Sequence, residues 1–120
     1  MKTAIAAALS LMASGTFAAP MSGSSPSGDV LVGDTGMTLY TFAKDAAGTS
    51  NCYDDCAAKW PPFLAEEGAK AEGRFSLVER MDAAKQWALD GMPLYYWVND
   101  KAAGDTTGDG VGGAWAVARP

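Results

Sequence analysis

The most informative stretch of this sequence is Gly91-Met-Pro-Leu-Tyr-Tyr-Trp-Val-Asn-Asp100, because an earlier stretch closely resembles it. Fifty-five residues upstream the chain reads Gly36-Met-Thr-Leu-Tyr-Thr-Phe-Ala-Lys-Asp45, with glycine, methionine, leucine, tyrosine and aspartate at the same positions. The same offset aligns Trp60 with Trp115. Because the ten-residue stretch and the later tryptophan both recur at the same offset, the chain is predicted to contain two copies of a single unit.

Both copies have the composition of β-strands. Met37–Ala43 is rich in aromatic and β-branched residues, and the alternation along a strand puts Tyr40 and Phe42 on the same face. Asp29–Val32 is also prone to form a strand, and Gly33–Gly36 between the two has turn chemistry. We therefore expect these two strands to pair as a β-hairpin.

The second half is predicted to be a meander of strands. Asp90-Gly91 is a two-residue signal for a tight hairpin turn. Proline is tolerated at the start of a strand, so it does not argue against a strand directly after this turn. The strands expected here are Phe75–Glu79, Lys85–Leu89, Pro93–Val98 and Ala114–Ala118.

One segment is helical in character. Asn51 is placed to cap a short helix over 52–59, and Pro61-Pro62 ends that helix. The chain is thus predicted to be mainly β, as a small antiparallel sheet, a sandwich or a barrel of about seven strands from two hairpin repeats. The sequence does not distinguish among these three arrangements.

The folded part is expected to be a single β domain over residues 29–118. Its two repeats occupy 29–64 and 75–118, and a charged, glycine-containing connector over 65–74 joins them. The serine, glycine and proline content of residues 19–28 predicts a flexible leader before the domain.

Residues 1–18 have the features of a secretory signal peptide. Lys2 supplies the positive start, Thr3–Met12 is an apolar run, and small residues lead to a predicted cleavage after Ala18. The apolar run is too short to span a bilayer. We therefore expect a secreted or periplasmic protein with no membrane insertion after cleavage.

The composition limits the possible functions. The chain has 120 residues, a formal net charge of −5 and no histidine. An acidic chain without clustered Lys and Arg does not favour nucleic acid or an anionic membrane as a partner. The lack of histidine removes the commonest general base and the commonest transition-metal ligand, so no cofactor is expected.

Three motifs in the chain match a known family. Tyr40–Asp45 and Tyr95–Asp100 both fit Y-x-[FWY]-x-x-D, and Cys52–Pro62 fits C-x3-C-A-x-x-W-P-P. The chain resembles the secreted or lipoprotein family with the Yx(FWY)xxD motif, a secreted repeat of unknown function. The resemblance covers about 29–118 and implies an exported bacterial protein with paired repeats and no established biochemical activity.

The chain departs from the family pattern at two places. Many members carry a lipidated cysteine after the signal peptide, which this chain lacks, so it is expected to be soluble and not lipidated. Many members also have a histidine beside the last tryptophan, where this chain has Ala116. A metal role for that histidine therefore does not carry over.

Cys52 and Cys56 are the two cysteines of the chain. Export places them in an oxidising compartment, where a disulfide is the default, and one helical turn would separate their Cα atoms by about 6 Å. The bond would hold the helix and present Trp60 to the core. The alternative is a copper-binding or thiol-redox pair, with a methionine such as Met92 as a third copper ligand.

The motif aromatics have two interpretations. Small domains need large side chains for their core, so the first is packing between two equivalent hairpins. The second is an exposed platform for sugar or peptide, because neighbouring aromatic residues on a strand face opposite ways. The residues concerned are Tyr40, Phe42, Trp60, Tyr95, Trp97 and Trp115.

The aspartate that closes each motif, Asp45 or Asp100, is expected to accept backbone N–H bonds in the turn that follows it. The alternative, a pair of catalytic carboxylates, has no nucleophile or positioned base beside it. Asp105 and Asp109 come after the second motif, but their spacing does not match an EF-hand calcium loop, so turn chemistry is the better interpretation.

These features predict a non-enzymatic secreted or periplasmic β module stapled by a disulfide. It would act through its surface on another envelope protein, a glycan or a small ligand. The alternative function is that of a periplasmic copper-binding or thiol-redox protein that uses the C-x3-C pair. An enzyme would need a pocket with convergent polar groups, which the sequence does not indicate.

Overall fold

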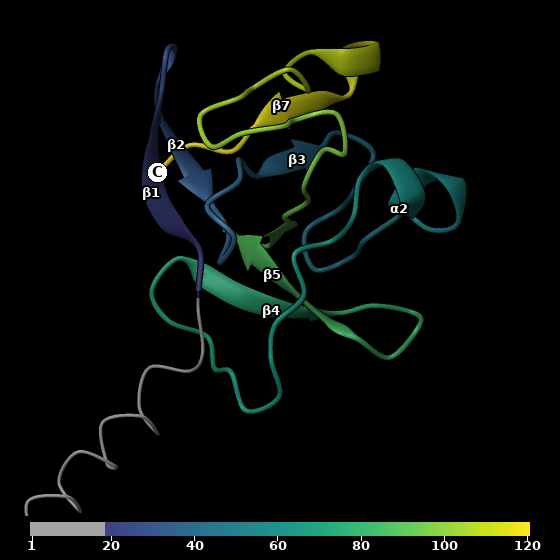
Figure 1. Cartoon of the computed structure of the whole chain (residues 1–120). Helices are drawn as coiled ribbons and strands as arrows, with labels where there is room; N and C mark the ends of the chain where they lie inside the picture. The colour runs from purple at the N-terminus through teal and green to yellow at the C-terminus, as the bar shows by residue number, and fades with distance from the viewer. Residues whose placement is uncertain (1–18) are drawn as a thin grey trace, which may run out of the picture.

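The computed structural model describes residues 19–120 (Figure 1), and the predicted signal peptide lies outside these residues. The described chain forms seven β-strands, one short α-helix and one 3-10 turn. The elements are β1 (Met21–Ser25), β2 (Gly28–Val32), β3 (Tyr40–Phe42), α2 (Asp55–Lys59), β4 (Phe75–Glu79), β5 (Lys85–Leu89), β6 (Met92–Pro93), η1 (Val111–Gly113) and β7 (Trp115–Val117).

The strands form three small antiparallel sheets. The first pairs β1 with β2, the second pairs β3 with β7, and the third has the order β4-β5-β6. The described strands do not close into a barrel, and Figure 1 shows the β3–β7 pair and the β4–β5 hairpin on opposite sides of the centre. The predicted mainly β fold, with about seven strands and one short helix, is confirmed.

The first strand, β1, corrects the prediction of a flexible leader over 19–28. Met21–Ser25 pairs along its whole length with Gly28–Val32. Its own side chains are mostly exposed, but its partner strand carries the buried residues Val30 and Leu31. The order of β1 therefore comes from backbone pairing with an anchored neighbour, which a composition of serine and glycine does not reveal.

The predicted hairpin over 29–43 forms only in part. The Leu39 N–H donates to the Leu31 carbonyl at 2.9 Å, as that hairpin requires. The next strand, β3, pairs instead with β7, with Tyr40 opposite Val117 and Phe42 opposite Trp115. The C-terminal strand takes the place beside β3 because their side chains share one aromatic core.

The β4–β5 hairpin and the turn after it form as predicted. Asp90 and Gly91 have φ angles of 50° and 88°, and a two-residue turn of this kind requires positive values at both positions. The next strand is shorter than the predicted Pro93–Val98, because β6 ends at Pro93. Beyond it, Tyr95 pairs singly with Tyr40 and with Pro62 rather than extending one ladder.

The helix α2 begins three residues later than the predicted helix over 52–59. Asn51 does not cap it: its side-chain amide donates to the Lys44 carbonyl at 2.9 Å. The Asn51 backbone N–H is held by the Asp45 carboxylate at 2.7 Å, which draws the chain away from a helical path. Asp54 precedes the helix with a φ of 56° and makes no capping bond.

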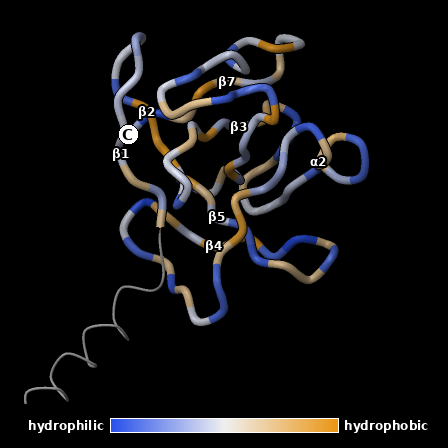
Figure 2. The backbone as a smooth tube through the Cα atoms, in the orientation of Figure 1, coloured by the Kyte–Doolittle hydropathy of each residue, from blue (hydrophilic) through white to orange (hydrophobic). Residues whose placement is uncertain are grey.

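The core has two parts, and Figure 2 shows hydrophobic residues along the inner strands and hydrophilic residues on the outer loops. Neighbouring residues such as Leu39 and Tyr40, or Leu94 and Tyr95, belong to different clusters because strand side chains alternate. The first cluster is Val30, Tyr40, Cys52, Trp60, Tyr95, Trp115 and Val117. The second cluster is Leu31, Leu39, Phe63, Trp87, Leu94 and Ala118.

Candidate functional site

The two copies of the motif meet at their tyrosines. The Tyr40 N–H donates to the Tyr95 carbonyl at 2.8 Å, and the Tyr95 N–H donates to the Tyr40 carbonyl at 2.9 Å. These two residues occupy the same position in the duplicated stretch. The reciprocal bonds therefore relate the two copies by a local, approximate two-fold axis that passes between them.

The side chains of the motif then cross from one copy to the other. The Tyr40 hydroxyl donates to Oδ2 of Asp100 at 2.6 Å, and the Tyr95 hydroxyl donates to Oδ2 of Asp45 at 2.7 Å. Both tyrosines are fully buried, and both aspartates are buried. Each motif therefore supplies a donor to the other copy and an acceptor from it.

The second oxygen of each carboxylate holds the turn that comes after the motif. Asp45 Oδ1 accepts the Asn51 backbone N–H at 2.7 Å. Asp100 Oδ1 accepts the backbone N–H of Thr107 at 3.0 Å and its hydroxyl at 2.6 Å. This is the backbone bonding that the sequence predicts for both aspartates, whereas the crossed tyrosine bonds are not foreseen by it.

The aromatic side chains form one continuous stack across the two copies. Trp60 and Trp115, which are equivalent by the offset of the repeat, lie parallel with ring centroids 3.8 Å apart. Phe42 stacks on Trp115 at 4.1 Å, and Trp97 stacks on Trp60 at 3.9 Å. Phe42 is equivalent to Trp97, so the order of the stack is symmetric about its centre.

The motif tyrosines close the sides of this stack. Tyr40 meets Trp60 edge to face at 5.3 Å, and Tyr95 meets Trp115 in the same way at 5.2 Å. Such geometry is favoured because the positive edge of one ring faces the negative face of the other. The structure thus places the motif aromatics in the core, with Phe42 and Trp97 half-buried at the two ends of the stack.

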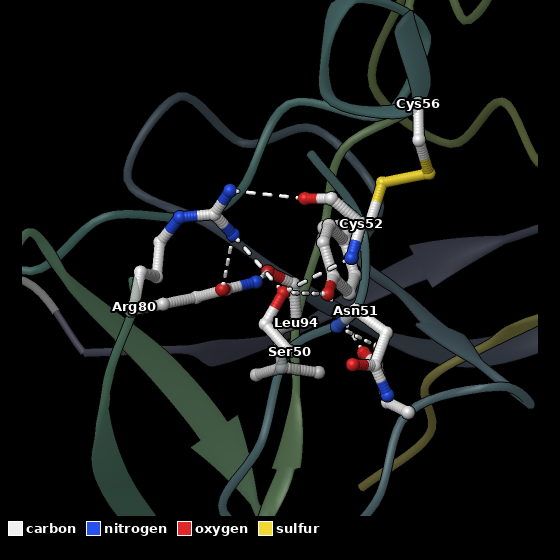
Figure 3. Close-up of a disulfide and its surroundings, with 9 residues drawn as sticks. Ser50, Asn51, Cys52, Cys56, Arg80 and Leu94 are labelled. Atoms are coloured by element: carbon white, nitrogen blue, oxygen red, sulfur yellow. Dashed lines mark hydrogen bonds between the residues drawn. A yellow bond between two sulfur atoms is a disulfide. The ribbon is translucent and has the colours of Figure 1, made fainter. Parts of the chain in front are cut away.

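A buried cation, which sequence reasoning missed, extends the polar network on one side. The Arg80 side chain is nearly inaccessible and donates to the Ser50 hydroxyl at 3.2 Å, the Gln86 side-chain carbonyl at 2.8 Å and the Cys52 backbone carbonyl at 3.0 Å (Figure 3). Ser50 lies 2.6 Å from the Tyr95 hydroxyl. The guanidinium is thereby linked through hydrogen bonds to the crossed tyrosine.

The sequence contains a signal that Arg80 is buried. It stands two residues after Val78, so the alternation along the strand puts it on the same, core-facing side. A charged residue at such a position indicates a buried partner network, because an unpaired buried charge is very costly. Its acceptors Asp82 and Gln86 lie in the same hairpin, but Ser50 and the Cys52 carbonyl are distant in sequence and could not be identified in the same way.

The predicted disulfide between Cys52 and Cys56 is present, with Cα atoms 5.2 Å apart. It closes a loop that carries Tyr53, whose ring lies 4.4 Å from the Arg80 guanidinium carbon. The Tyr53 hydroxyl also accepts the Met81 backbone N–H at 2.9 Å. The disulfide therefore holds one wall of the pocket that encloses the buried cation.

The alternative copper site has no support from the geometry of the described residues. Both sulfur atoms are bonded to one another, and Cys52 is fully buried. Met92 lies on β6 opposite Leu89 and belongs to neither core cluster. Within residues 19–120, no three or more Cys, Asp or Glu side chains are grouped so that they could hold a metal ion.

Burial shifts the ionisation of the motif side chains. It raises the pKa of Asp45, although the bonds that this carboxylate accepts from Tyr95 and Asn51 act in the opposite direction. Burial is also the main cause that raises the pKa of Tyr40 and Tyr95, and the carboxylate that each one faces raises it further. The site is thus adjusted to keep its tyrosines protonated.

The loop after the second motif is organised by turn chemistry, as predicted. Asp105 Oδ2 accepts the backbone N–H groups of Lys101 and Ala102 at 2.8 and 3.0 Å. Asp109 Oδ1 accepts the Val117 N–H at 3.1 Å, which fixes the loop against β7. Among residues 19–120, every buried side-chain nitrogen and oxygen has a hydrogen-bond partner.

A surface groove of about 520 Å³ lies away from the motif. Its walls are mainly apolar and include Leu31, Phe75 and the exposed Met21, with Arg74 at its edge. None of the motif residues lines it.

The helices in the described part of the chain are too short and too polar to cross a membrane.

Comparison with known proteins gives one family. The chain matches the family described as a secreted repeat of unknown function over residues 22–63 and again over residues 76–119. The matches begin in β1 and β4, so the first repeat includes the strand that the sequence assigned to the leader. No curated protein and no solved structure matches the chain. The chain therefore belongs to this family of secreted repeats of unknown function and carries two copies of its repeat.

Proposed function

We propose that this protein is a non-enzymatic β module that acts outside the cytoplasm through its outer surface. The observation that carries this proposal is the state of the motif residues. Their hydroxyl and carboxylate groups are buried and bonded to one another. Groups that are fully engaged in the scaffold are not free to bind or transform a substrate.

Export is supported by the N-terminal sequence and by the family. The segment before residue 19 has the pattern of a signal peptide, with cleavage after Ala18. Both cysteines of the chain are used in the disulfide, so neither is available for a lipid. We propose a soluble secreted or periplasmic protein whose partner is another envelope protein, a glycan or a small ligand.

The localisation is tested by the mass of the exported protein. The full chain is expressed with its N-terminus intact, and the cell fractions are compared by mass spectrometry. We expect the mature chain to begin at Ala19, in the soluble extracytoplasmic fraction, with two hydrogens fewer than the dithiol. A chain that retains Lys2, or one that stays in the membrane fraction, would contradict this part of the proposal.

The next experiment tests the proposed binding role against the copper-binding alternative. The mature chain is reduced under anaerobic conditions and titrated with Cu(I), beside Cys56→Ser and Met92→Leu variants. We expect no stoichiometric copper binding by the wild type. Tight binding that is lost in Cys56→Ser would replace the proposal by the copper-binding alternative.

The surface role is tested with arrays of envelope glycans and with purified envelope proteins. We expect the oxidised chain to bind saturably, and unlabelled protein to compete for the same sites. The Tyr40→Phe variant, which changes only a buried hydroxyl, should bind equally well. Catalytic turnover of any arrayed compound that disappears in a folded Asp45→Asn variant would show that the carboxylates are catalytic instead.

A further inference from the structure

We infer that the interface between the two repeats is a recognition surface, and that the partner it fits is the complementary half of a second copy of this chain. The first half consists of residues 19–64, and the second half consists of residues 75–120. Two copies would exchange halves across the connector over 65–74 and form a dimer with two native interfaces.

The bonds between the motif tyrosines and aspartates run between the halves. The Tyr40 hydroxyl in the first half bonds to Asp100 in the second, and Tyr95 in the second half bonds to Asp45 in the first. The ring stack likewise alternates between the halves. An isolated half would therefore leave two buried polar groups and its aromatic face without partners.

Each half also completes the backbone pairing of the other. In the first half, the Leu31 N–H donates to the carbonyl of Ala118, and the Ala118 N–H donates to the Leu39 carbonyl. Ala118 belongs to the second half, directly after β7. The segment after the tryptophan has thus crossed to the opposite repeat.

The same exchange occurs in the reverse direction. The Trp87 N–H donates to the Phe63 carbonyl at 2.9 Å, and the Phe63 N–H donates to the Leu94 carbonyl at 2.9 Å. Phe63 is equivalent to Ala118 by the offset of the repeat, and Leu94 is equivalent to Leu39. The β3–β7 pair and these bonds therefore need both halves, whereas the β1–β2 and β4–β5–β6 sheets each form within one half.

The interface fits a first half to a second half and does not fit two like halves. Besides Asp82 and Gln86 of its own half, Arg80 contacts Ser50, the Cys52 carbonyl and the Tyr53 ring, which belong to the first half. The first half has Ser25 at the position equivalent to Arg80. A pair of first halves would therefore lack the cation that this pocket binds.

A pair of second halves would be mismatched for a related reason. Gly108 stands at the position equivalent to Tyr53, and a Cβ there would lie 2.8 Å from the Trp60 ring of the first half and 3.0 Å from Trp97. The second half thus has no aromatic ring to cover a guanidinium. Exchange is expected to pair a first half with a second half every time.

The connector allows the exchange. The hydrogen bonds of residues 66–74 stay within the connector or reach the second half, as in the bond from the Asp90 N–H to the Arg74 carbonyl. The charged residues of the connector are exposed. The contacts of the interface are the same within one chain or between two, so the covalent link favours the monomer only through a millimolar effective concentration.

The test shortens the connector in the full mature chain by deleting residues 66–73. Ala65 is bonded to Lys85, and Phe75 is opposite Leu89, four residues further along the other edge of β5. These anchor points lie at least about 13 Å apart along the strand. After the deletion Ala65 is joined directly to Arg74, and the two peptide units that remain between Ala65 and Phe75 span at most about 7 Å.

The shortened chain is expected to be a dimer with the far-ultraviolet and aromatic circular dichroism of the wild type. The matched control inserts about six Gly and Ser residues after Gly68, which a flexible link tolerates, and should remain a monomer. Wild-type protein refolded at millimolar concentration should also yield a dimer fraction that rises with concentration. Size-exclusion chromatography with light scattering measures all three.

Cross-linking identifies the contacts in the dimer. Isotope-labelled and unlabelled copies are mixed while unfolded, refolded, cross-linked and analysed by mass spectrometry. We expect links between the first half of one copy and the second half of the other, at residue pairs that are neighbours in the monomer. A folded monomer, an unfolded shortened chain, or links that join like halves would each overturn the inference.

Discussion

A single oxygen distinguishes tyrosine from phenylalanine, and at Tyr40 and Tyr95 that oxygen reaches a carboxylate of the opposite repeat. This explains why the first motif position specifies tyrosine, whereas the third accepts any aromatic ring. The ring of Tyr40 packs edge-on against Trp60, and its hydroxyl satisfies a buried acceptor. Phe42 and Trp97, at the third position, only have to stack.

The first prediction at this scale concerns these hydroxyls. Tyr40→Phe and Tyr95→Phe should each lower the free energy of unfolding by about 1.5–3 kcal/mol, because a charge-assisted bond is lost and a buried carboxylate oxygen is left unpaired. Tyr40→Ala and Tyr95→Ala should cost about 3 kcal/mol or more through the added cavity. Urea unfolding measures both sets.

The matched control for the hydroxyl is Tyr53→Phe. The Tyr53 hydroxyl accepts one exposed backbone N–H, that of Met81, and touches neither motif aspartate. Its removal should have a clearly smaller effect than removal of either motif hydroxyl. Equal effects at Tyr40 and Tyr53 would mean that the crossed bond stabilises the fold no more than the exposed hydrogen bond of Tyr53 does.

The raised pKa of Asp45 gives a second prediction. Because burial disfavours its charged form, the folded protein binds a proton at this carboxyl more tightly than the unfolded chain does. The contribution of Asp45 to the free energy of unfolding is therefore fully present below 3.8, the pKa in the unfolded chain. It is lost as the pH rises through the pKa in the folded protein. The Asp45→Asn variant should lack this dependence.

The measurement is the free energy of unfolding of both proteins between acidic and neutral pH. The wild-type value minus the Asp45→Asn value should rise as the pH falls from 7 toward the unfolded pKa. Other groups cancel in the difference, including Asp82 and Asp90, whose pKa values are lowered and which act in the opposite direction. A difference that falls on acidification would contradict the assignment.

The tyrosines give a third prediction, at alkaline pH. Burial raises the pKa of Tyr40 and Tyr95 above the ordinary 10.0 and that of Tyr96 to about 12. Their contribution to stability is present below 10.0 and is lost as the pH rises beyond it, because the unfolded chain ionises first. The phenolate absorbance that comes from these three tyrosines should therefore rise together with unfolding rather than before it.

At the scale of elements, the parts that the sequence predicts well are those whose side chains carry the signal. The β4–β5 hairpin and the Asp90-Gly91 turn form where the alternation and the turn residues put them. The strand β1 was missed because it buries little and depends on its neighbour β2. The helix was predicted to begin too early because the Asp45 carboxylate competes for the backbone of Asn51.

The disulfide belongs to this scale because it fixes the loop before α2. The double variant Cys52→Ser, Cys56→Ser should lose about 2 kcal/mol of stability or less, because a loop this small removes little entropy from the unfolded chain. The fold should persist, with the core around Tyr40 and Trp60 intact. Thermal unfolding of the oxidised, reduced and double-variant proteins tests this, and a variant that cannot fold would contradict it.

The whole molecule is a duplication whose halves are interlocked. The sequence reveals the duplication, because the aromatic pattern recurs at a constant offset. It does not reveal the crossing, because alternation tells which side chains share a face but not which copy supplies their partner. The buried Arg80 illustrates the same limit: its acceptors Ser50 and Cys52 lie about thirty positions away in the other repeat.

The crossing also explains how a small chain builds a stable core. The polar groups of one repeat are satisfied by the other, and the four-ring stack is shared equally between them. Stability and duplication are therefore coupled: neither repeat is expected to fold alone. What remains free for a partner is the outer surface, which the motif does not use.

The most direct measurement is a double-mutant cycle on unfolding free energies that compares crossed pairs with pairs inside one repeat. Tyr40→Phe combined with Asp100→Asn, and Tyr95→Phe combined with Asp45→Asn, should show coupling of about 1–3 kcal/mol. Tyr40→Phe combined with Asp45→Asn should be additive within about 0.5 kcal/mol. Strong coupling inside one repeat, or none across the two, would contradict the account.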